Sequence, residues 1–336
     1  MILIDAVFVN NGGGKVLLDY LIKNIEDSRI DVFYLLDKRN SDDPNFKTLK
    51  NKSFIKGSLF SRYLFYHTNK VIFNKIICFG NMPPLKKMNA IVYTYFHQKL
   101  FLDIPPELNL NFKIQLYIKS LVVKYLKKNT NFWMVQTSLI KKQILTKYNL
   151  KENTILELPF YKPLANLNSS FQVKEDIFLY VSPATSHKNH LRLIEAFESF
   201  YKKYNFGELW LTVFDNTDLS NLIQEKFKNN IPIINLYKIE GKELENAYSK
   251  SKFVIFPSLS ESFGLGLIEG IAFNCNIIGS DLPYTYEICD PSIIFDPYDS
   301  KSIESSFVKA MNSDYSSTVP KVSNKINDIL KILNND

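Results

Sequence analysis

The chain has 336 residues, which is long for a single core because domains usually run to roughly 100–200 residues, so its length predicts two domains. Hydrophobic residues make up 46% and charged residues 22%, which fits a globular protein and excludes a disordered chain. The formal net charge is +7, and the three cysteines (Cys78, Cys275 and Cys289) match neither a zinc site nor a disulfide framework. No segment approaches about 18 consecutive apolar residues, and the opening stretch MILIDAVFVNNGGGK lacks a signal peptide's features, so we expect a cytoplasmic protein.

Ten short apolar runs, rich in β-branched and aromatic residues, alternate with helical patterns along the chain. They cover residues 2–9, 31–36, 75–80, 90–97, 132–137, 176–182, 209–214, 231–237, 252–258 and 276–281. Runs that are apolar on both faces are typical of buried parallel strands, and their alternation with helices indicates repeated βαβ units. We therefore expect an α/β fold of two Rossmann-like domains that face each other across a cleft.

The segment 156–176 marks the expected boundary between these domains. It contains Pro159 and Pro163 and a cluster of Asn and Ser, and it shows no helical or strand period after Pro163. We place the two domains at residues 1–165 and 166–318. Residues 319–336 carry an amphipathic pattern and are expected to form a C-terminal helix that packs back on the N-terminal domain.

A basic segment lies in the first domain, because residues 111–150 hold eight lysines and no acidic residue. A helical wheel places Lys113, Lys124, Lys127 and Lys128 on one face. It places Ile114, Ile118, Leu121, Val122 and Tyr125 on another. This basic amphipathic helix is either a solvated face over a packed core or a surface for an anionic membrane, while nucleic acid is disfavoured because no nucleic-acid motif accompanies it.

The first strand leads into NNGGGKVLLDYLI, where three glycines precede a predicted helix. A backbone without side chains can approach a ligand closely, and a helix N-terminus favours phosphate or carboxylate. The loop is neither a Walker A motif, which would need glycine at Val9 and Ser or Thr at Val16, nor a dinucleotide fingerprint, which would need a small residue at Leu17. A tight turn without a ligand explains it equally well.

The stretch VSPATSHKNHLRLIEAF (181–197) places Lys188 just before another predicted helix. A lysine there would add a full charge to the partial charge of the helix amides and so favour a phosphate. The alternative is that Asn189 or Ser186 caps the helix and that Lys188 is an ordinary surface lysine.

The most specific stretch is FPSLSESFGLGLIEG (256–270). Gly264 and Gly266 stand where a helix should begin, so amides there can bind a diphosphate. Phosphate would repel a carboxylate, so Glu261 and Glu269 are better explained as acceptors for sugar hydroxyl groups. The alternative is that Ser262 caps the helix and that the glutamates are surface residues.

His97 ends the predicted strand in YTYFHQKL, at the edge of the sheet where ligands bind, although a lone histidine is often structural. His187 and His190 have no acidic or cysteine partners at ligand spacing, so no metal site is predicted.

Four stretches together resemble the retaining glycosyltransferases of family 4, which have the GT-B fold. They are SESFGLGLIE, SHKNHLRLIEAF, FWMVQTSLIKKQILTKY and GSDLPYTYEICDPSIIFDPYD, and the resemblance covers nearly all of residues 176–310 and the N-terminal half more loosely. It implies that residues 1–165 bind the acceptor and that residues 166–318 bind a nucleotide-sugar donor.

The resemblance also implies roles for individual residues. Lys188 would be the counter-charge to the donor diphosphate, Glu269 the partner of the nucleotide ribose, and Glu261 the partner of sugar hydroxyls near the reacting carbon. Other members hold phosphate or the transferred sugar with positions that correspond here to Ser262, Phe263, Gly264, Leu265, Gly13, Gly14 and His97. Ser182 departs from the pattern, because many members carry an arginine there.

The implied reaction transfers a sugar from a nucleotide-diphosphate sugar to a hydroxyl group with its anomeric configuration kept, and it needs no metal or other cofactor. The lysine-rich helix favours a lipid-linked saccharide acceptor in O-antigen or capsule biosynthesis, at the inner face of the cytoplasmic membrane. Two alternatives remain, a nucleotide-sugar 2-epimerase on the same scaffold and a non-catalytic saccharide- or nucleotide-binding protein.

Overall fold

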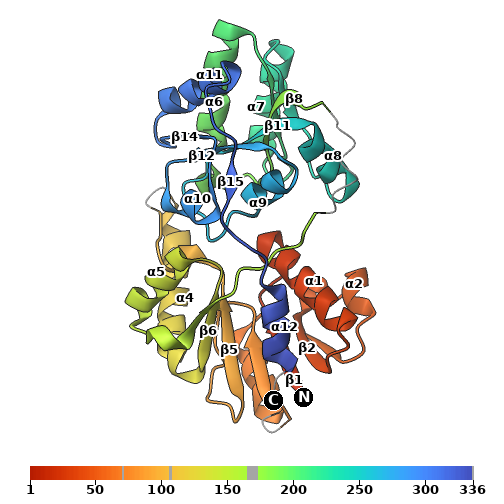
Figure 1. The fold of residues 1–336 in the computed structure, drawn as a ribbon. Helices are drawn as coiled ribbons and strands as arrows, with labels where there is room; N and C mark the ends of the chain where they lie inside the picture. The colour runs from red at the N-terminus through yellow and green to blue at the C-terminus, as the bar shows by residue number, and fades with distance from the viewer. Residues whose placement is uncertain (70–71, 106–107, 165–172, 335–336) are drawn as a thin grey trace. The chain divides into compact units, whose positions relative to one another are not determined.

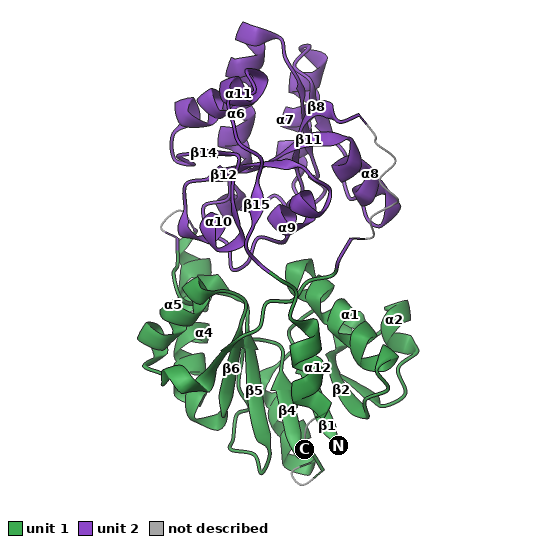
Figure 2. Ribbon diagram, in the orientation of Figure 1, with its two compact units in different colours: residues 1–104, 109–162, 323–336 green, residues 105–108, 163–322 purple. Residues whose placement is uncertain are grey.

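The computed structural model describes residues 1–69, 72–105, 108–164 and 173–334 (Figure 1). The chain forms two compact units, coloured separately in Figure 2. Unit 1 consists of residues 1–104, 109–162 and 323–336, and unit 2 of residues 105–108 and 163–322. The domain boundary expected near residue 165 lies outside the described residues.

Unit 1 contains a parallel sheet with seven strands among the described residues. Their order is β3 (Lys52–Ile55), β2 (Val32–Asp37), β1 (Ile2–Ala6), β4 (Lys75–Cys78), β5 (Ile91–Phe96), β6 (Phe132–Val135) and β7 (Ile155–Glu157). All five strands expected in this half are present. The two edge strands β3 and β7 were not expected, because they are only four and three residues long and carry little apolar signal.

Helices cover this sheet. They are α1 (Gly12–Asp27), α2 (Pro44–Lys47), α3 (Leu59–Thr68), α4 (Leu110–Leu126), α5 (Ser138–Tyr148) and α12 (Ile326–Asn334). The C-terminal helix α12 packs against α1, as expected (Figure 1). The Nζ atom of Lys75 donates to the carbonyl oxygens of Ile332 (2.7 Å) and Leu333 (3.2 Å), where the C-terminal end of the helix dipole favours a cation.

The C-terminal helix begins later than predicted. Residues Val319–Pro320 form a short strand, β15, that pairs antiparallel with β13 (Cys289–Asp290) in unit 2. Only the chain from residue 323 onward belongs to unit 1, so α12 starts at Ile326 and not near residue 319.

Unit 2 contains a second parallel sheet, six-stranded in its described part. The order is β10 (Ile233–Asn235), β9 (Glu208–Leu211), β8 (Glu175–Tyr180), β11 (Ser251–Phe256), β12 (Asn276–Ser280) and β14 (Ile293–Phe295). Its helices are α6 (His190–Tyr204), α7 (Thr217–Lys228), α8 (Lys242–Lys250), α9 (Leu265–Ala272), α10 (Pro283–Ile288) and α11 (Ser300–Met311). All five expected strands are present, so the prediction of two Rossmann-like α/β domains is confirmed.

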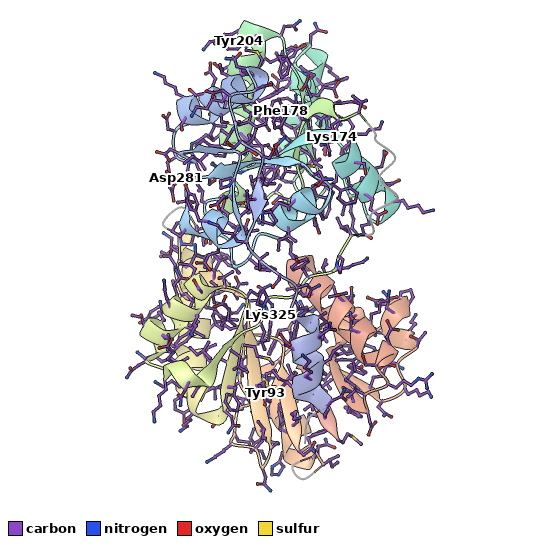
Figure 3. All side chains as sticks on the ribbon, in the orientation of Figure 1. Tyr93, Lys174, Phe178, Tyr204, Asp281 and Lys325 are labelled. Atoms are coloured by element: carbon purple, nitrogen blue, oxygen red, sulfur yellow. The ribbon has the colours of Figure 1, made fainter. Side chains whose placement is uncertain are left out.

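Aromatic rings fill the interior of unit 2. Phe178, labelled in Figure 3, lies on the central strand β8. Its ring stacks on Phe253 of β11 at a centroid distance of 5.0 Å and meets Phe307 of α11 edge-on at 4.7 Å. These contacts fix α11 against one face of the sheet.

Helix α4 packs with a different face from the apolar one seen in the sequence. The residues that pack inward are Leu116, Ser120, Val123 and Leu126, whereas Ile114, Ile118, Leu121 and Tyr125 are exposed. The alternative in which this apolar face covers the core is therefore wrong. The helix has two apolar faces, and only one of them lies against the sheet. No helix in the described part of the chain is both long enough and apolar enough to cross a bilayer.

Candidate active site

The loop between β11 and α9 has a backbone shape that only small residues allow. Gly264, just before the helix, has a φ of +77°, in the left-handed region that favours glycine. Gly270, within α9, is restricted by packing against β11, because a Cβ atom there would lie 2.7 Å from Cγ2 of Val254. The predicted alternative of a Ser262 cap is wrong, because Gly264 occupies the N-cap position and no side chain caps the helix.

Lys188 and Glu261 form an ion pair, although 73 residues separate them in the sequence. Lys188 ends the short 3-10 helix Ser186–Lys188 ahead of α6, and Glu261 lies in the loop before α9. Their side chains are only 14% and 11% exposed, so little water screens the pair. The structure therefore joins two of the predicted site residues directly.

Asn189 occupies the N-cap position of α6, but its side chain makes no capping hydrogen bond and instead fixes the loop that carries Lys188. Its backbone is left-handed, and its side-chain Nδ2 donates to the carbonyl oxygens of Pro257 (3.2 Å) and Pro297 (2.8 Å). The hydroxyl of Tyr180, on β8, donates to the carbonyl oxygen of Lys188 at 3.0 Å. Lys188 is thus held by neighbouring loops and is not an ordinary surface lysine.

Glu269 lies on α9 and accepts a hydrogen bond of 2.8 Å from the hydroxyl of Tyr248 on α8. Tyr248 is fully buried, and its burial, followed by the nearby charge of Glu269, raises the pKa of its phenol well above the usual range. Tyr248 therefore stays a neutral donor that orients one oxygen of the carboxylate. No sequence pattern indicated this tyrosine, because it is 21 residues away on a different helix.

Ser182 provides no substitute for the arginine that the family pattern would place there. It is buried, its amide donates to Oγ1 of Thr212 at 3.0 Å, and its hydroxyl donates to the carbonyl oxygen of Pro183 at 3.3 Å. A neutral side chain used in this way cannot balance phosphate charge. Lys188 is the cation that remains among the residues predicted for this unit's site.

In unit 1 the glycine loop meets His97. Helix α1 begins at Gly12, so Gly13 and Gly14 lie in its first turn, where helix amides have no partner within the helix. A Cβ atom on Gly14 would lie 3.0 Å from Nε2 of His97, which explains the need for glycine there. The neighbouring Lys15 is engaged by Asp19 (2.5 Å) and Asp43 (2.6 Å), and it is held away from the loop by these bonds.

Asn81 also contacts His97. Its Oδ1 accepts from the His97 amide at 2.6 Å, and its Nδ2 lies 3.3 Å from Nε2 of the ring. Burial lowers the pKa of His97 to about 4, so the imidazole is neutral at pH 7. Asn81 was not predicted as a site residue, although its position after Gly80 at the end of β4 is typical of a turn.

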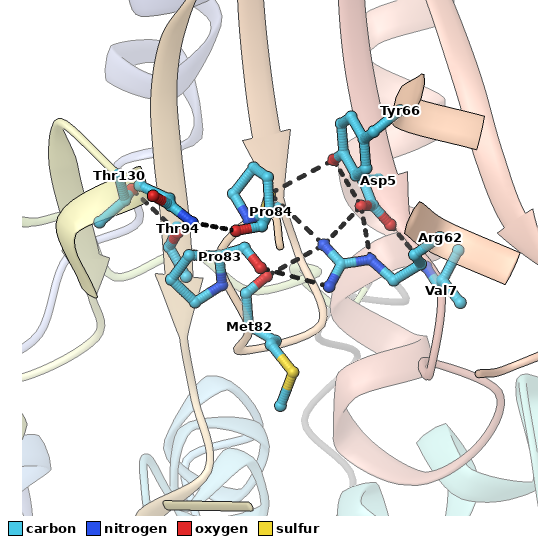
Figure 4. Close-up of polar contacts among 11 residues, drawn as sticks. Asp5, Val7, Arg62, Tyr66, Met82, Pro83, Pro84, Thr94 and Thr130 are labelled. Carbon is cyan, nitrogen blue, oxygen red and sulfur yellow. Dashed lines mark hydrogen bonds and ion pairs between the residues drawn. The ribbon is translucent and has the colours of Figure 1, made fainter. Parts of the chain in front are cut away.

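A buried ion pair fixes the loop that carries Asn81 (Figure 4). Arg62 donates to Oδ2 of Asp5 from Nη2 (2.6 Å) and Nε (2.9 Å), and its Nη2 also donates to the carbonyl oxygen of Met82 at 3.0 Å. The hydroxyl of Tyr66 adds a bond of 2.6 Å to the same carboxylate oxygen. Asp5 and Arg62 are almost fully buried, so their charges serve to position the segment next to Asn81.

The lysines predicted to face a membrane divide into two groups. Lys124 and Lys128 are exposed, whereas Lys113 is partly buried. Lys127 lies beyond the end of α4 and donates to the carbonyl oxygens of Tyr148 (2.5 Å) and Asn149 (3.4 Å), which end helix α5. The prediction that Lys127 belongs to the exposed basic face is therefore wrong, because it caps a neighbouring helix.

Two parallel-sheet α/β units with functional loops at the strand ends define the GT-B class of fold. Sucrose-phosphate synthase from Thermosynechococcus elongatus has a similar structure, with a TM-score of 0.68 and 14% identity over 93% of this chain and 89% of that chain. At this level of identity the likeness shows the fold alone.

Comparison at the sequence level identifies the second unit more closely. Residues 167–325, just under half of the chain, match the family model described as Glycosyl transferases group 1. The chain is similar to the O-antigen chain mannosyltransferase RfbU of Salmonella typhimurium, with 30% identity over 138 residues, which is 39% of this chain and 37% of that protein. It is also similar to the capsular polysaccharide biosynthesis glycosyltransferase CapH of Staphylococcus aureus, with 29% identity over 134 residues, which is 37% of this chain and 36% of that one. Each match spans little more than a third of the relative's length.

Proposed function

We propose that this protein is a retaining glycosyltransferase that moves a sugar from a nucleotide-diphosphate sugar to a hydroxyl group of a lipid-linked glycan, in the synthesis of O-antigen or capsule. The group 1 glycosyl transferase match and the names of the two relatives support this class of reaction. The structural observation that carries the proposal is the shielded pair of Lys188 and Glu261 in the loops that precede α6 and α9.

The donor diphosphate binds at the N-terminus of α9 in this proposal. Ser262 and the amides of Phe263, Gly264 and Leu265 contact it, because the first turn of a helix offers unpaired N–H groups and the positive end of the helix dipole. Lys188 adds a full charge. An ammonium group has three N–H donors, so Lys188 can bind a phosphate oxygen while it keeps Glu261.

The two glutamates take separate hydroxyl groups. Glu269 accepts from the nucleotide ribose, and its hydrogen bond to Tyr248 fixes the direction in which its second oxygen points. Glu261 accepts from hydroxyls of the transferred sugar. Each carboxylate avoids the phosphates, which would repel it.

For unit 1, taken by itself, we propose that the amides of Gly13 and Gly14 bind phosphate and that His97 binds a sugar hydroxyl group. Because burial keeps the imidazole neutral, His97 serves as a hydrogen-bonding group for a sugar hydroxyl and not as a cation.

The reaction breaks the bond between the anomeric carbon and the diphosphate oxygen and forms a bond from that carbon to the acceptor oxygen on the same face. The departing phosphate oxygen takes the acceptor's hydroxyl proton, so neither a metal nor another cofactor is required. The protein contributes charge stabilisation of the departing diphosphate through Lys188 and the α9 amides. The enzyme acts in the cytoplasm, peripherally attached to the inner face of the membrane that holds its acceptor.

A thermal-shift series tests the donor site. At a concentration of about 100 Kd, the correct nucleotide-diphosphate sugar should stabilise the protein by about 2.7 kcal/mol and raise the Tm by several degrees. UDP-, GDP- and dTDP-sugars are the candidates, and a CMP-sugar, which lacks a diphosphate, is the control. If no diphosphate sugar stabilises the fold, the proposal is wrong.

Variants of the two glutamates test their roles. We expect Glu269→Ala to weaken nucleotide binding and Glu261→Ala mainly to lower turnover, while Glu243→Ala on the exposed face of α8 is the matched control. Proton NMR of the product should show the anomeric configuration of the donor. An inverted product, or a new sugar-nucleotide isomer formed without acceptor, would contradict a retaining transferase.

A further inference from the structure

Helix α4 carries a continuous apolar stripe that points away from unit 1. Its members are Leu110, Ile114, Tyr117, Ile118, Leu121 and Tyr125, and their exposed fractions run from 46% for Leu121 to 71% for Leu110. Their spacing of three, four and seven residues puts them on one face of a helix, and we call this face the outer stripe. An isolated exposed leucine needs no explanation, but six large apolar residues along four turns of one helix do.

The sequence around the outer stripe is strongly basic. Residues 44–151 contain 19 Lys and Arg residues against two acidic residues, Asp103 and Glu107. Lys119, Lys124 and Lys128 are exposed on α4 or just beyond it, and Nζ of Lys128 lies 4.9 Å from the centre of the Tyr125 ring. A helix with an exposed apolar face and only positive charge at its margins is typical of helices that lie in a membrane interface.

A second helix extends the same side of the unit. The chain passes from β3 to β4 through α3 and from β5 to β6 through α4, in the same direction along the sheet order. Because such crossovers are right-handed, α3 and α4 lie on the same face of the sheet. Helix α3 also exposes large apolar residues, with Phe60 at 70%, Tyr63 at 40% and Leu64 at 45%.

The charges indicate which kind of partner binds this surface. A symmetric contact between two copies would bring the same lysines face to face without acidic partners, which costs free energy. Lysine is depleted in the cores of protein interfaces, where arginine is favoured. All the basic residues among residues 108–151 are lysines. The phosphate backbone of a nucleic acid would leave the apolar residues of the stripe without a partner. An anionic lipid surface offers both a negative headgroup layer and an apolar layer beneath it.

We propose that α4 lies in the plane of an anionic membrane with its outer stripe inserted below the headgroups. Leu110, Ile114, Ile118 and Leu121 enter the boundary between headgroups and acyl chains, at a depth of about 5–10 Å. Tyr117 and Tyr125 keep their hydroxyl groups at headgroup level, and the exposed lysines contact the lipid phosphates. This inference deepens the proposed function, on which it rests for the idea of a lipid-linked acceptor, and it names the element that brings unit 1 to that acceptor.

Vesicle binding tests the inference without any need for activity. The full chain is floated with vesicles of phosphatidylcholine alone or with phosphatidylglycerol added, at low and high salt. We expect binding to the anionic vesicles that weakens as salt rises. Ile118→Ser/Leu121→Ser should bind at least about tenfold more weakly, because two apolar side chains no longer enter the bilayer. Since both residues point outward, the Tm of this variant should stay unchanged.

Two further variants complete the design. Phe227→Ser, at an equally exposed position on α7 of unit 2, is the matched control and should bind as the parent does. Lys119→Glu/Lys124→Glu/Lys128→Glu should lose the preference for anionic lipid, and it leaves Lys127 in place because that residue caps α5. Equal vesicle binding by the stripe variant and the parent would overturn the inference. So would a parent that ignores vesicles but forms dimers that the stripe variant cannot form.

The donor thermal shift separates this inference from the proposed function. A parent protein that binds vesicles but is stabilised by no nucleotide sugar would contradict only the proposed function. A parent that is stabilised by a donor but does not bind anionic vesicles would contradict only the membrane surface.

Discussion

The ion pair between Lys188 and Glu261 gives a prediction whose size follows from its burial. Breaking a fully buried pair costs about 3–5 kcal/mol because one charge stays behind without a partner. The side chains of Lys188 and Glu261 are 14% and 11% exposed, so the pair is not fully buried. We therefore expect Lys188→Met to lower the free energy of unfolding of unit 2 by about 2–3 kcal/mol. Glu261→Gln keeps an acceptor oxygen for the ammonium group and should cost about 1–2 kcal/mol. The double variant leaves no charge stranded, so its loss should be smaller than the sum by about 1–2 kcal/mol.

Urea unfolding can measure this coupling in unit 2 alone. The chain has two tryptophans, Trp133 on β6 of unit 1 and Trp210 on β9 of unit 2, so a Trp133→Phe background leaves one reporter for unit 2. The pair of Lys238 and Glu240 in unit 2 is a control, because its side chains are 62% and 73% exposed and exposed pairs couple by only about 0.2–1 kcal/mol. If the Lys188 and Glu261 variants are additive within about 0.5 kcal/mol, the pair does not stabilise unit 2 and the reasoning is refuted.

Two other predictions concern single side chains of unit 2. Tyr248→Phe should weaken nucleotide binding by about fivefold to tenfold, because it removes the hydrogen bond that orients Glu269. Calorimetric titration measures the affinity, and an unchanged affinity would show that Tyr248 has no orienting role. Burial, and then the charge of Lys188, lowers the pKa of His190 to about 4 from its usual 6.5, so the unfolded chain takes up a proton before the folded one does. The resulting loss of stability should be absent above pH 6.5 and grow by roughly 1 kcal/mol per pH unit as the pH falls from 6.5 towards 4. His190→Phe, which keeps a ring against Tyr180, should remove this slope in Trp210-monitored unfolding, and an unchanged slope would contradict the assignment.

Ten strands of the two parallel sheets were predictable because continuous apolar runs such as those of β1 and β11 have few structural alternatives. Edge strands β3, β7 and β14 were not predicted, since short segments such as Lys52–Ile55 and Ile293–Phe295 contain no comparable pattern. Helix α4 shows a different limit. The helical wheel left open whether the apolar face of α4 covers the core or meets a membrane, because which face of a helix meets the sheet depends on neighbours that the local sequence does not specify.

The loops of the candidate site were visible in the sequence, because glycines at helix starts have a local physical reason. Contacts between distant segments were not. Nothing in the spacing of Lys188 and Glu261 indicates that they pair, and neither Tyr248 nor Asn81 belongs to a motif. Such partners depend on which loops the sheet order brings together, so they emerge only from the folded chain.

The return of the chain to unit 1 at α12 has a consequence for biosynthesis. Unit 2 is inserted between residues 162 and 323 of unit 1, so the ribosome must make more than 150 intervening residues before unit 1 has all its parts. Until then the side of α1 that later meets α12 stays uncovered, and the ammonium group of Lys75 lacks the two carbonyl groups that it binds in the finished molecule. Residues 105–108 and 163–322, which make up unit 2, are all synthesised before α12, so unit 2 has all its parts before unit 1 does.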